Sequence, residues 1–135
     1  MINIQGFFRR EGKFWLVELP ALDQISSGES KDQALQIAKE FVEILLEEYN
    51  LLPCKIQIKA LRNKVFLEAS NPSAIFALSL KRLRGSRPQK EISDILQFKS
   101  INSYQQYENS EREPSISQAI KLLEALNPNI KLCLG

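Results

Sequence analysis

Four side chains between residues 102 and 106 can each hydrogen-bond in the way that base edges require. They are Asn102, Ser103, Gln105 and Gln106. An Asn or Gln amide carries a donor and an acceptor together, and adenine presents the matching pair in the major groove. The segment therefore predicts a helix that hydrogen-bonds base edges of double-stranded DNA. A structural alternative stays open, because Asn102 followed by Gln105 is also the spacing of a helix N-cap and its partner.

Positive charge gathers beside this segment. The whole chain carries a net charge of only +2, but the excess of Lys and Arg lies beyond residue 71. Five basic residues fall between positions 81 and 90 with no acidic residue among them. Such a run favours a polyanionic partner, although a solvated helix face can show the same composition. The remaining residues expected to contact DNA, mainly its phosphates, are Arg84, Arg87, Gln89, Lys90, Lys99, Ser100 and Arg112.

The residue types argue against catalysis. The sequence has no histidine, which removes the commonest general base and metal ligand. Cys54 and Cys133 lack the paired spacing of a zinc or redox site. Glu18 and Asp23 stand alone near the end of the first hairpin, which is too few carboxylates to hold two divalent cations. We therefore expect no enzyme activity, no metal and no cofactor. With no signal peptide and no long apolar run, we also expect a cytoplasmic protein without a membrane partner.

The first half predicts a small antiparallel sheet and one long helix, in the order β-β-β-α-β. The expected strands are residues 2–8, 13–19, 24–26, 55–61 and 65–69. The segment Ser30 to Gln33 has the pattern of a capping box, in which Gln33 returns a hydrogen bond to Ser30. The apolar stripe expected to pack on the sheet consists of Ala34, Ile37, Ala38, Phe41, Val42, Leu45 and Tyr49.

The second half predicts four short amphipathic helices, so the fold class is α+β with an all-α C-terminal part. They are expected to start at Pro72, at Pro88, after a break at 97–101, and at Ile116. Inward positions include Ile95 in the second, Tyr104 and Tyr107 in the third, and Ile116 in the fourth. The apolar alternation at 130–134 is expected to pair as a strand across a dimer, or else to fold back over the first of these helices. The domains are expected to be residues 1–70 and 71–135.

Residues 1 to 61 resemble the partial RNase H-like domain of HicB antitoxins. The resemblance rests on Phe7, Trp15, Pro20 and the helix start from Gly28 to Ala34. It implies that this domain binds a small HicA-like toxin, an RNA-cleaving protein, and blocks its active surface. An exposed aromatic residue is a candidate protein contact, and an acidic helix rim suits a basic partner. The residues expected to contact the toxin are Phe14, Trp15, Glu40, Glu43 and Glu47.

Residues 73 to 127 resemble the helix-turn-helix domain of the Cro/repressor family. LKRLRGSRPQKEISDIL matches its first two helices, YQQYE the end of the recognition helix and EPS the start of the fourth, whereas the turn QFKSIN is one residue longer than usual and lacks its glycine. Together the resemblances imply an antitoxin that also represses its own operon by binding operator DNA as a homodimer or higher homo-oligomer. The alternative is a plain transcription regulator whose first domain dimerises or senses a ligand.

Overall fold

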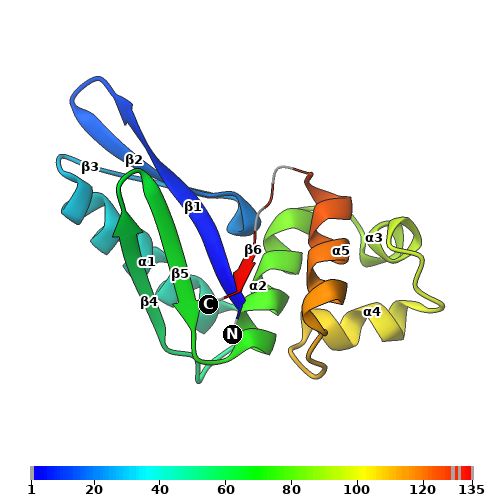
Figure 1. Cartoon of the computed structure of the whole chain (residues 1–135). Helices are drawn as coiled ribbons and strands as arrows, with labels where there is room; N and C mark the ends of the chain where they lie inside the picture. The colour runs from blue at the N-terminus through cyan, green and yellow to red at the C-terminus, as the bar shows by residue number, and fades with distance from the viewer. Residues whose placement is uncertain (1, 129, 131, 135) are drawn as a thin grey trace.

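The computed structural model describes residues 2–128, 130 and 132–134, and its architecture is α+β, with a sheet and one helix followed by four helices (Figure 1). The strands are β1 Ile2–Glu11, β2 Phe14–Leu19, β3 Gln24–Gly28, β4 Ile56–Leu61, β5 Lys64–Ala69 and β6 Leu132–Leu134. The helices are α1 Lys31–Glu48, α2 Pro72–Arg84, α3 Gln89–Ile95, α4 Ile101–Glu108 and α5 Ile116–Leu126, with a 3-10 turn η1 at Pro20–Leu22. The predicted fold class and order of elements are confirmed.

The sheet is antiparallel at every pairing, in the order β3-β2-β1-β5-β4. Its central strand, β1, changes partner along one of its edges. β2 pairs with β1 from Phe7 to Glu11, and β6 pairs with it from Ile2 to Ile4. Gly6 lies at this change, where a Cβ would collide with the backbone carbonyl of Glu18. Only a glycine therefore lets β1 pass so close to β2.

The C-terminal strand β6 is part of this sheet. It pairs with the start of β1 in the same chain, with Asn3 opposite Cys133 and Ile4 opposite Leu132, and Figure 1 shows the two chain ends side by side. The prediction that this tail pairs across a dimer is wrong. β2 turns away at Pro20, because proline cannot continue the ladder, and this leaves an edge of β1 open within the chain. An intramolecular strand fills that edge without the entropy cost of association.

Helix α1 begins at Ser30, as predicted, but the second hydrogen bond expected at its start goes to a different residue. The Ser30 hydroxyl accepts from the amide of Gln33 at 3.1 Å, as expected for an N-cap. The Gln33 side chain accepts from the amide of Glu29 at 2.6 Å, one residue before the predicted position. The helix start is thus satisfied by two hydrogen bonds, although the capping box itself is not formed.

The face that α1 turns to the sheet is rotated from the predicted stripe. Its buried residues are Ala34, Ala38, Val42, Leu45 and Leu46. Ile37, Phe41 and Tyr49, which were expected to face the sheet, are 37–39% exposed. The rotation follows from the small side chain of Ala34, which lets the helix approach Gly28 of the edge strand β3. Leu46 then takes the place on the sheet that we had assigned to its larger neighbours.

Helix α2 is shared by the sheet and the helical part of the chain. Seven consecutive residues, 74–80, are buried, and a helix that is buried all round lies inside a core. It contacts η1 and α1 on one side and α4 and α5 on the other. The buried apolar residues form one cluster from Ile4 to Ile130. The predicted domain boundary coincides with the start of α2, capped by Asn71, but the core is continuous across it.

A charged side chain ties α2 to the sheet. Arg82 donates from Nε to the carbonyl of Leu22 and from Nη2 to the carbonyl of Asp23, both at 2.9 Å. Asp23 has a φ of 48°, in the left-handed region that is unfavourable for residues other than glycine. Two charge-assisted bonds from α2 thus hold the turn after β2 in this conformation.

We expect Arg82→Ala to lower the free energy of unfolding by about 1–2 kcal/mol, because two carbonyls lose a charged donor. Urea denaturation followed by circular dichroism measures this loss. Arg9→Ala is the matched control, since the exposed Arg9 side chain pairs with the half-buried Glu18 and its loss should cost under about 1 kcal/mol. Equal losses in both variants would contradict a structural role for Arg82.

Candidate nucleic-acid interface

Helices α3 and α4 form a compact pair joined by a tight turn. The amide of Phe98 donates to the carbonyl of Ser93 at 3.0 Å, and the Ser93 hydroxyl donates to the carbonyl of Ser100 at 3.3 Å. Gln97 adopts a φ of 61°, the conformation that glycine takes most easily. The longer turn without glycine is therefore built around a glutamine in the left-handed region.

The N-cap of α4 is Ser100. Its hydroxyl accepts from the amide of Ser103 at 3.2 Å and lies 3.1 Å from the Ser103 hydroxyl. The alternative in which Asn102 caps the helix with Gln105 is therefore wrong. Because Ser100 has this role, the Asn102 side chain remains available on the surface.

Two aromatic residues anchor α4 to the core. Tyr104 is fully buried and Tyr107 is 2% exposed, which confirms their predicted inward position. Phe98 packs against both rings, and Phe76 of α2 makes an edge contact with Tyr107. The opposite face of α4 is thereby directed to solvent.

The exposed face of α4 carries side chains able to contact bases. Asn102 and Gln106 are exposed, one helical turn apart, and Ser103 is half-buried between them. Residues four apart lie on the same side of a helix. Neither amide forms a hydrogen bond within the described residues, so donor and acceptor are both free for a base edge.

A buried ion pair joins the end of α4 to the end of α2. Arg84 donates from Nε and Nη2 to the two carboxylate oxygens of Glu108, at 2.8 and 3.0 Å. The Glu108 side chain is completely buried and that of Arg84 is 22% exposed. The guanidinium also donates from Nη1 to the carbonyl of Arg87 at 2.9 Å. We expected Arg84 to contact a DNA phosphate, but its guanidinium instead forms hydrogen bonds within the protein.

Two predicted contact residues extend this ion pair into a polar network. Gln89 donates from Nε2 to Glu108 at 3.3 Å and accepts from Nε2 of Gln105 at 2.6 Å. The network links the first residue of α3 to α4. Gln89 and Gln105 are both half-buried, so their amides help to position the two helices and are less free than those of Asn102 and Gln106.

The other basic residues expected to contact phosphates fall into two groups, those bonded within the protein and those exposed to solvent. Arg87 is half-buried, and it donates to the carbonyls of Leu83 and Arg84 at 2.8 and 3.2 Å. Lys90 and Lys99 are exposed on α3 and on the turn. Arg112 is exposed too, with its guanidinium 5.5 Å from the centre of the Tyr107 ring. The last three are the cations of this group that remain open to a phosphate.

Arg84 and Tyr104, which both lie beside Glu108, have raised pKa values. The hydrogen bond to Glu108 raises the pKa of Arg84, and this outweighs the opposing effect of burial. Burial raises the pKa of Tyr104 far above its usual value, and the neighbouring Glu108 adds to the shift. Both shifts favour the state that each group already has at neutral pH, a charged Arg84 and a neutral Tyr104 phenol.

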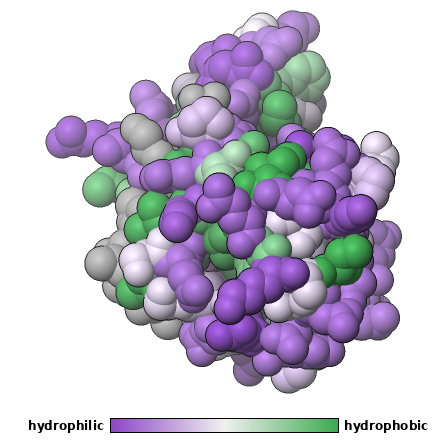
Figure 2. Space-filling model, turned by 90° about the vertical axis from the view of Figure 1, so that its right-hand side faces the viewer, coloured by the Kyte–Doolittle hydropathy of each residue, from purple (hydrophilic) through white to green (hydrophobic). Residues whose placement is uncertain are grey.

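The surface of the helical part agrees with a polar interface. Figure 2 shows that the face made by these helices is mostly hydrophilic, with small hydrophobic areas between polar side chains.

Ile95, Ile101 and Ile116 are exposed by 38–47%, although Ile95 and Ile116 were predicted to face inward. Both lie on short helices, where a shift of one residue moves a side chain out of the core.

The residues predicted to contact a toxin lie on two separate surfaces. Phe14 is 49% exposed on the face of the sheet opposite α1. Trp15 points to the other face, where it packs on Phe8 and has the cations of Arg10 and Lys31 within 5.2 and 4.7 Å of its ring centre. The three glutamates, Glu40, Glu43 and Glu47, are exposed on α1. The structure therefore does not bring the aromatic and acidic residues together.

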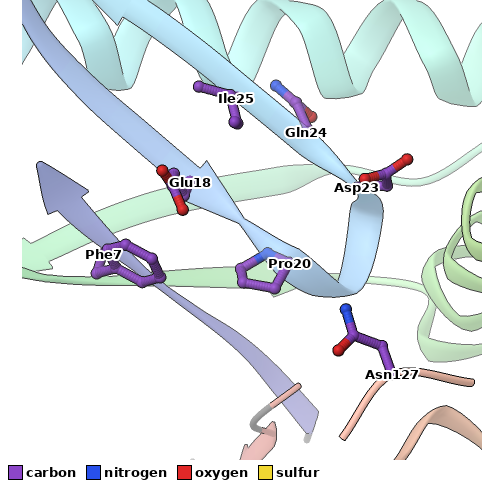
Figure 3. A pocket seen from close by; sticks show the side chains of 7 residues that line it. All are labelled: Phe7, Glu18, Pro20, Asp23, Gln24, Ile25 and Asn127. Carbon is purple, nitrogen blue, oxygen red and sulfur yellow. The ribbon is translucent and has the colours of Figure 1, made fainter. Parts of the chain in front are cut away.

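An open pocket of about 470 Å³ lies between the sheet and the end of α5 (Figure 3). It is lined by Phe7, Glu18, Pro20, Asp23, Gln24, Ile25 and Asn127. Glu18 is already paired with Arg9 at 2.8 Å. The pocket is large enough for a small metabolite, and its Asp23 is held by Arg82 of α2.

Sequence reasoning missed Glu108, the centre of the polar network. It follows Tyr104 by four residues, so the two share the inward face of α4. An acidic residue at an inward position requires a buried cation, and Arg84 is a basic residue at the end of an adjacent helix. The position of Glu108 in the inward stripe was therefore the signal that could have revealed the pair.

Two helices joined by a tight turn, the second exposing free amides beside cations, have the arrangement of a DNA-binding helix-turn-helix. Comparison with protein families agrees, because residues 78–128 match the model described as Helix-turn-helix. The matched segment begins within α2 and ends just after α5. Comparison with curated proteins and with solved structures gives no match. The match supports a DNA-binding helix-turn-helix in the C-terminal part of the chain, of the kind found in transcription regulators. No helix among the described residues is long and apolar enough to cross a membrane.

We expect Arg84→Met to lower the free energy of unfolding by about 3–5 kcal/mol, because it leaves the buried Glu108 carboxylate without its cation. The double variant Arg84→Met/Glu108→Leu should be more stable than the single one, since it removes both charges. Urea denaturation measures both losses, and Arg112→Met is the exposed control. If the loss in the double variant equals the summed losses of Arg84→Met and of the single variant Glu108→Leu, the two residues are not coupled.

Proposed function

We propose that this protein regulates transcription by binding operator DNA through α4, as a dimer, without catalysing a reaction. The observation that carries the proposal is the pair of free amides, Asn102 and Gln106, on the exposed face of a helix anchored by buried tyrosines. Bidentate contacts from such amides discriminate between bases, and Lys90, Lys99 and Arg112 supply contacts to the backbone. Dimerisation is part of the proposal, because a single small domain buries too little surface for tight specific binding.

In this proposal the residues of the polar network position the helices and do not contact DNA. Gln89 and Gln105 set the angle between α3 and α4, and Arg84 with Glu108 sets the depth of α4 in the core. Ser100 and Ser103 cap α4 at the end that enters the groove first. The sheet with its pocket is the part that dimerises or senses a ligand, and Arg82 provides the direct link between the pocket and α2.

We expect Gln106→Ala to weaken binding to the preferred operator by about 1–3 kcal/mol and to relax base choice at one position, because one amide pair is lost. Lys90→Ala should weaken binding to all DNA alike and lower the slope of affinity against salt by about one. Sites selected from random DNA, followed by titration of fluorescent duplexes at several salt concentrations, distinguish the two. Equal, sequence-independent losses in both variants would refute the assignment of α4.

A second candidate function is that of a HicB-like antitoxin that neutralises a HicA-like RNA-cleaving toxin. The observation that favours it is the acidic row on α1. Glu43 and Glu47 have no ion-pair partner among the described residues, and Glu40 bonds only to the amide of Gln36 at 3.0 Å. An acidic surface without its own cations suits a basic partner such as an RNA-binding protein.

The antitoxin proposal predicts a partner encoded beside this chain. We expect a short adjacent reading frame whose basic product arrests growth when expressed alone, and whose toxicity disappears when this protein is expressed with it. The two proteins should copurify, and the mixture should cleave RNA more slowly than the toxin alone. No complex at micromolar concentrations would refute the antitoxin role and leave operator binding unaffected.

A further inference from the structure

Helix α1 exposes an apolar stripe that has no partner among the residues that the structure describes. Ile37, Phe41 and Ile44 are 38%, 39% and 51% exposed. Their spacing of four and three residues places them in one row along the helix. Large apolar side chains arranged in a row on a surface usually mark a contact with another molecule, whereas single exposed ones do not.

The row lies along the outer flank of the sheet. Its neighbours on the buried side are Ala34 and Ala38, which contact β3: Gly28 packs against Ala34, and the carbonyl of Ala38 accepts from Nε2 of Gln24 at 3.3 Å. β3 is the last strand of the sheet on that side among the described residues. The row therefore continues outward from the sheet edge, where no described element covers it.

The negative charge on the other side of the row favours a basic partner. Glu40, Glu43 and Glu47 occupy the next positions around the helix, one helical turn apart. The two lysines of α1 do not neutralise them: Lys31 is bonded to Asn63 and lies over the rings of Phe8 and Trp15, and Lys39 forms no ion pair within the described residues. An apolar row beside an unneutralised acidic row matches a segment that carries apolar side chains next to Lys and Arg.

We propose that this surface, defined by Ile37, Phe41, Ile44, Glu40, Glu43 and Glu47, is the docking site for a basic amphipathic segment of another protein. A second copy of this chain fits less well, because its own α1 would bring a second acidic row to the same place. The inference deepens the proposed partner binding and rests on it. It adds an apolar anchor, Phe41, and places the contact on α1, away from Phe14 and from the DNA-binding face of α4.

A displayed library of random peptides tests the proposal without knowledge of the natural partner. We expect selection against the immobilised full chain to enrich sequences that combine apolar residues with Lys or Arg. Binding of a selected peptide, measured by fluorescence anisotropy, should fall at least tenfold in Phe41→Asp and again in the charge-reversed variant E40K/E43K/E47K. Leu61→Asp, at the exposed end of β4, and Glu124→Lys, on α5, are the matched controls and should bind normally.

Three outcomes would overturn the proposal. The first is that the selection enriches acidic peptides or none at all. The second is that Phe41→Asp binds the selected peptide as tightly as the unchanged chain, and the third is that the control variants lose as much affinity as Phe41→Asp. If sedimentation shows that the free protein self-associates and that Phe41→Asp makes it monomeric, the occupant is a second copy. Thermal unfolding of each variant excludes loss of fold. Operator affinity, measured in parallel, separates this result from DNA binding, and copurification with the adjacent gene product separates it from the antitoxin role.

Discussion

The arrangement of the DNA-binding helices depends on the ion pair between Arg84 and Glu108. A carboxylate that is completely buried is stable only when a cation and further donors reach it, and here Arg84 supplies two hydrogen bonds and Gln89 a third. These donors come from the end of α2 and the start of α3, while the carboxylate comes from the end of α4. One charge thus fixes three helix ends at a single point.

This constraint separates polar residues that look equivalent in the sequence. Gln105 and Gln106 are neighbours of the same type, yet Gln105 completes the buried network through Gln89 and Gln106 is free on the surface. Arg84 and Lys90 both belong to the basic run, yet only Lys90 keeps its charge open to solvent. The residue type shows which contacts a side chain can make, whereas the position relative to Glu108 decides which contacts it makes.

Local signals predicted the elements well, and long-range packing accounts for the errors. Caps such as Ser30, Asn71 and Ser115 bond to amides three residues on, so the starts of α1, α2 and α5 could be read from neighbouring residues. The rotation of α1 could not, because its periodicity fits either Phe41 or Leu46 facing the sheet and the close approach at Gly28 decides between them. The tail likewise required knowledge of which edge of β1 stays open.

The continuity of the core limits how the sheet can influence DNA binding. α2 is buried from residue 74 to 80 and contributes to the sheet side and to the helix-turn-helix at once. Arg82 further ties its end to the turn after β2. A shift between the two parts would break these bonds and expose apolar surface, which costs more than a weakly bound partner supplies. If a protein docks on α1 as proposed, we therefore expect it to affect operator binding through its bulk and its charge, and not through an internal hinge.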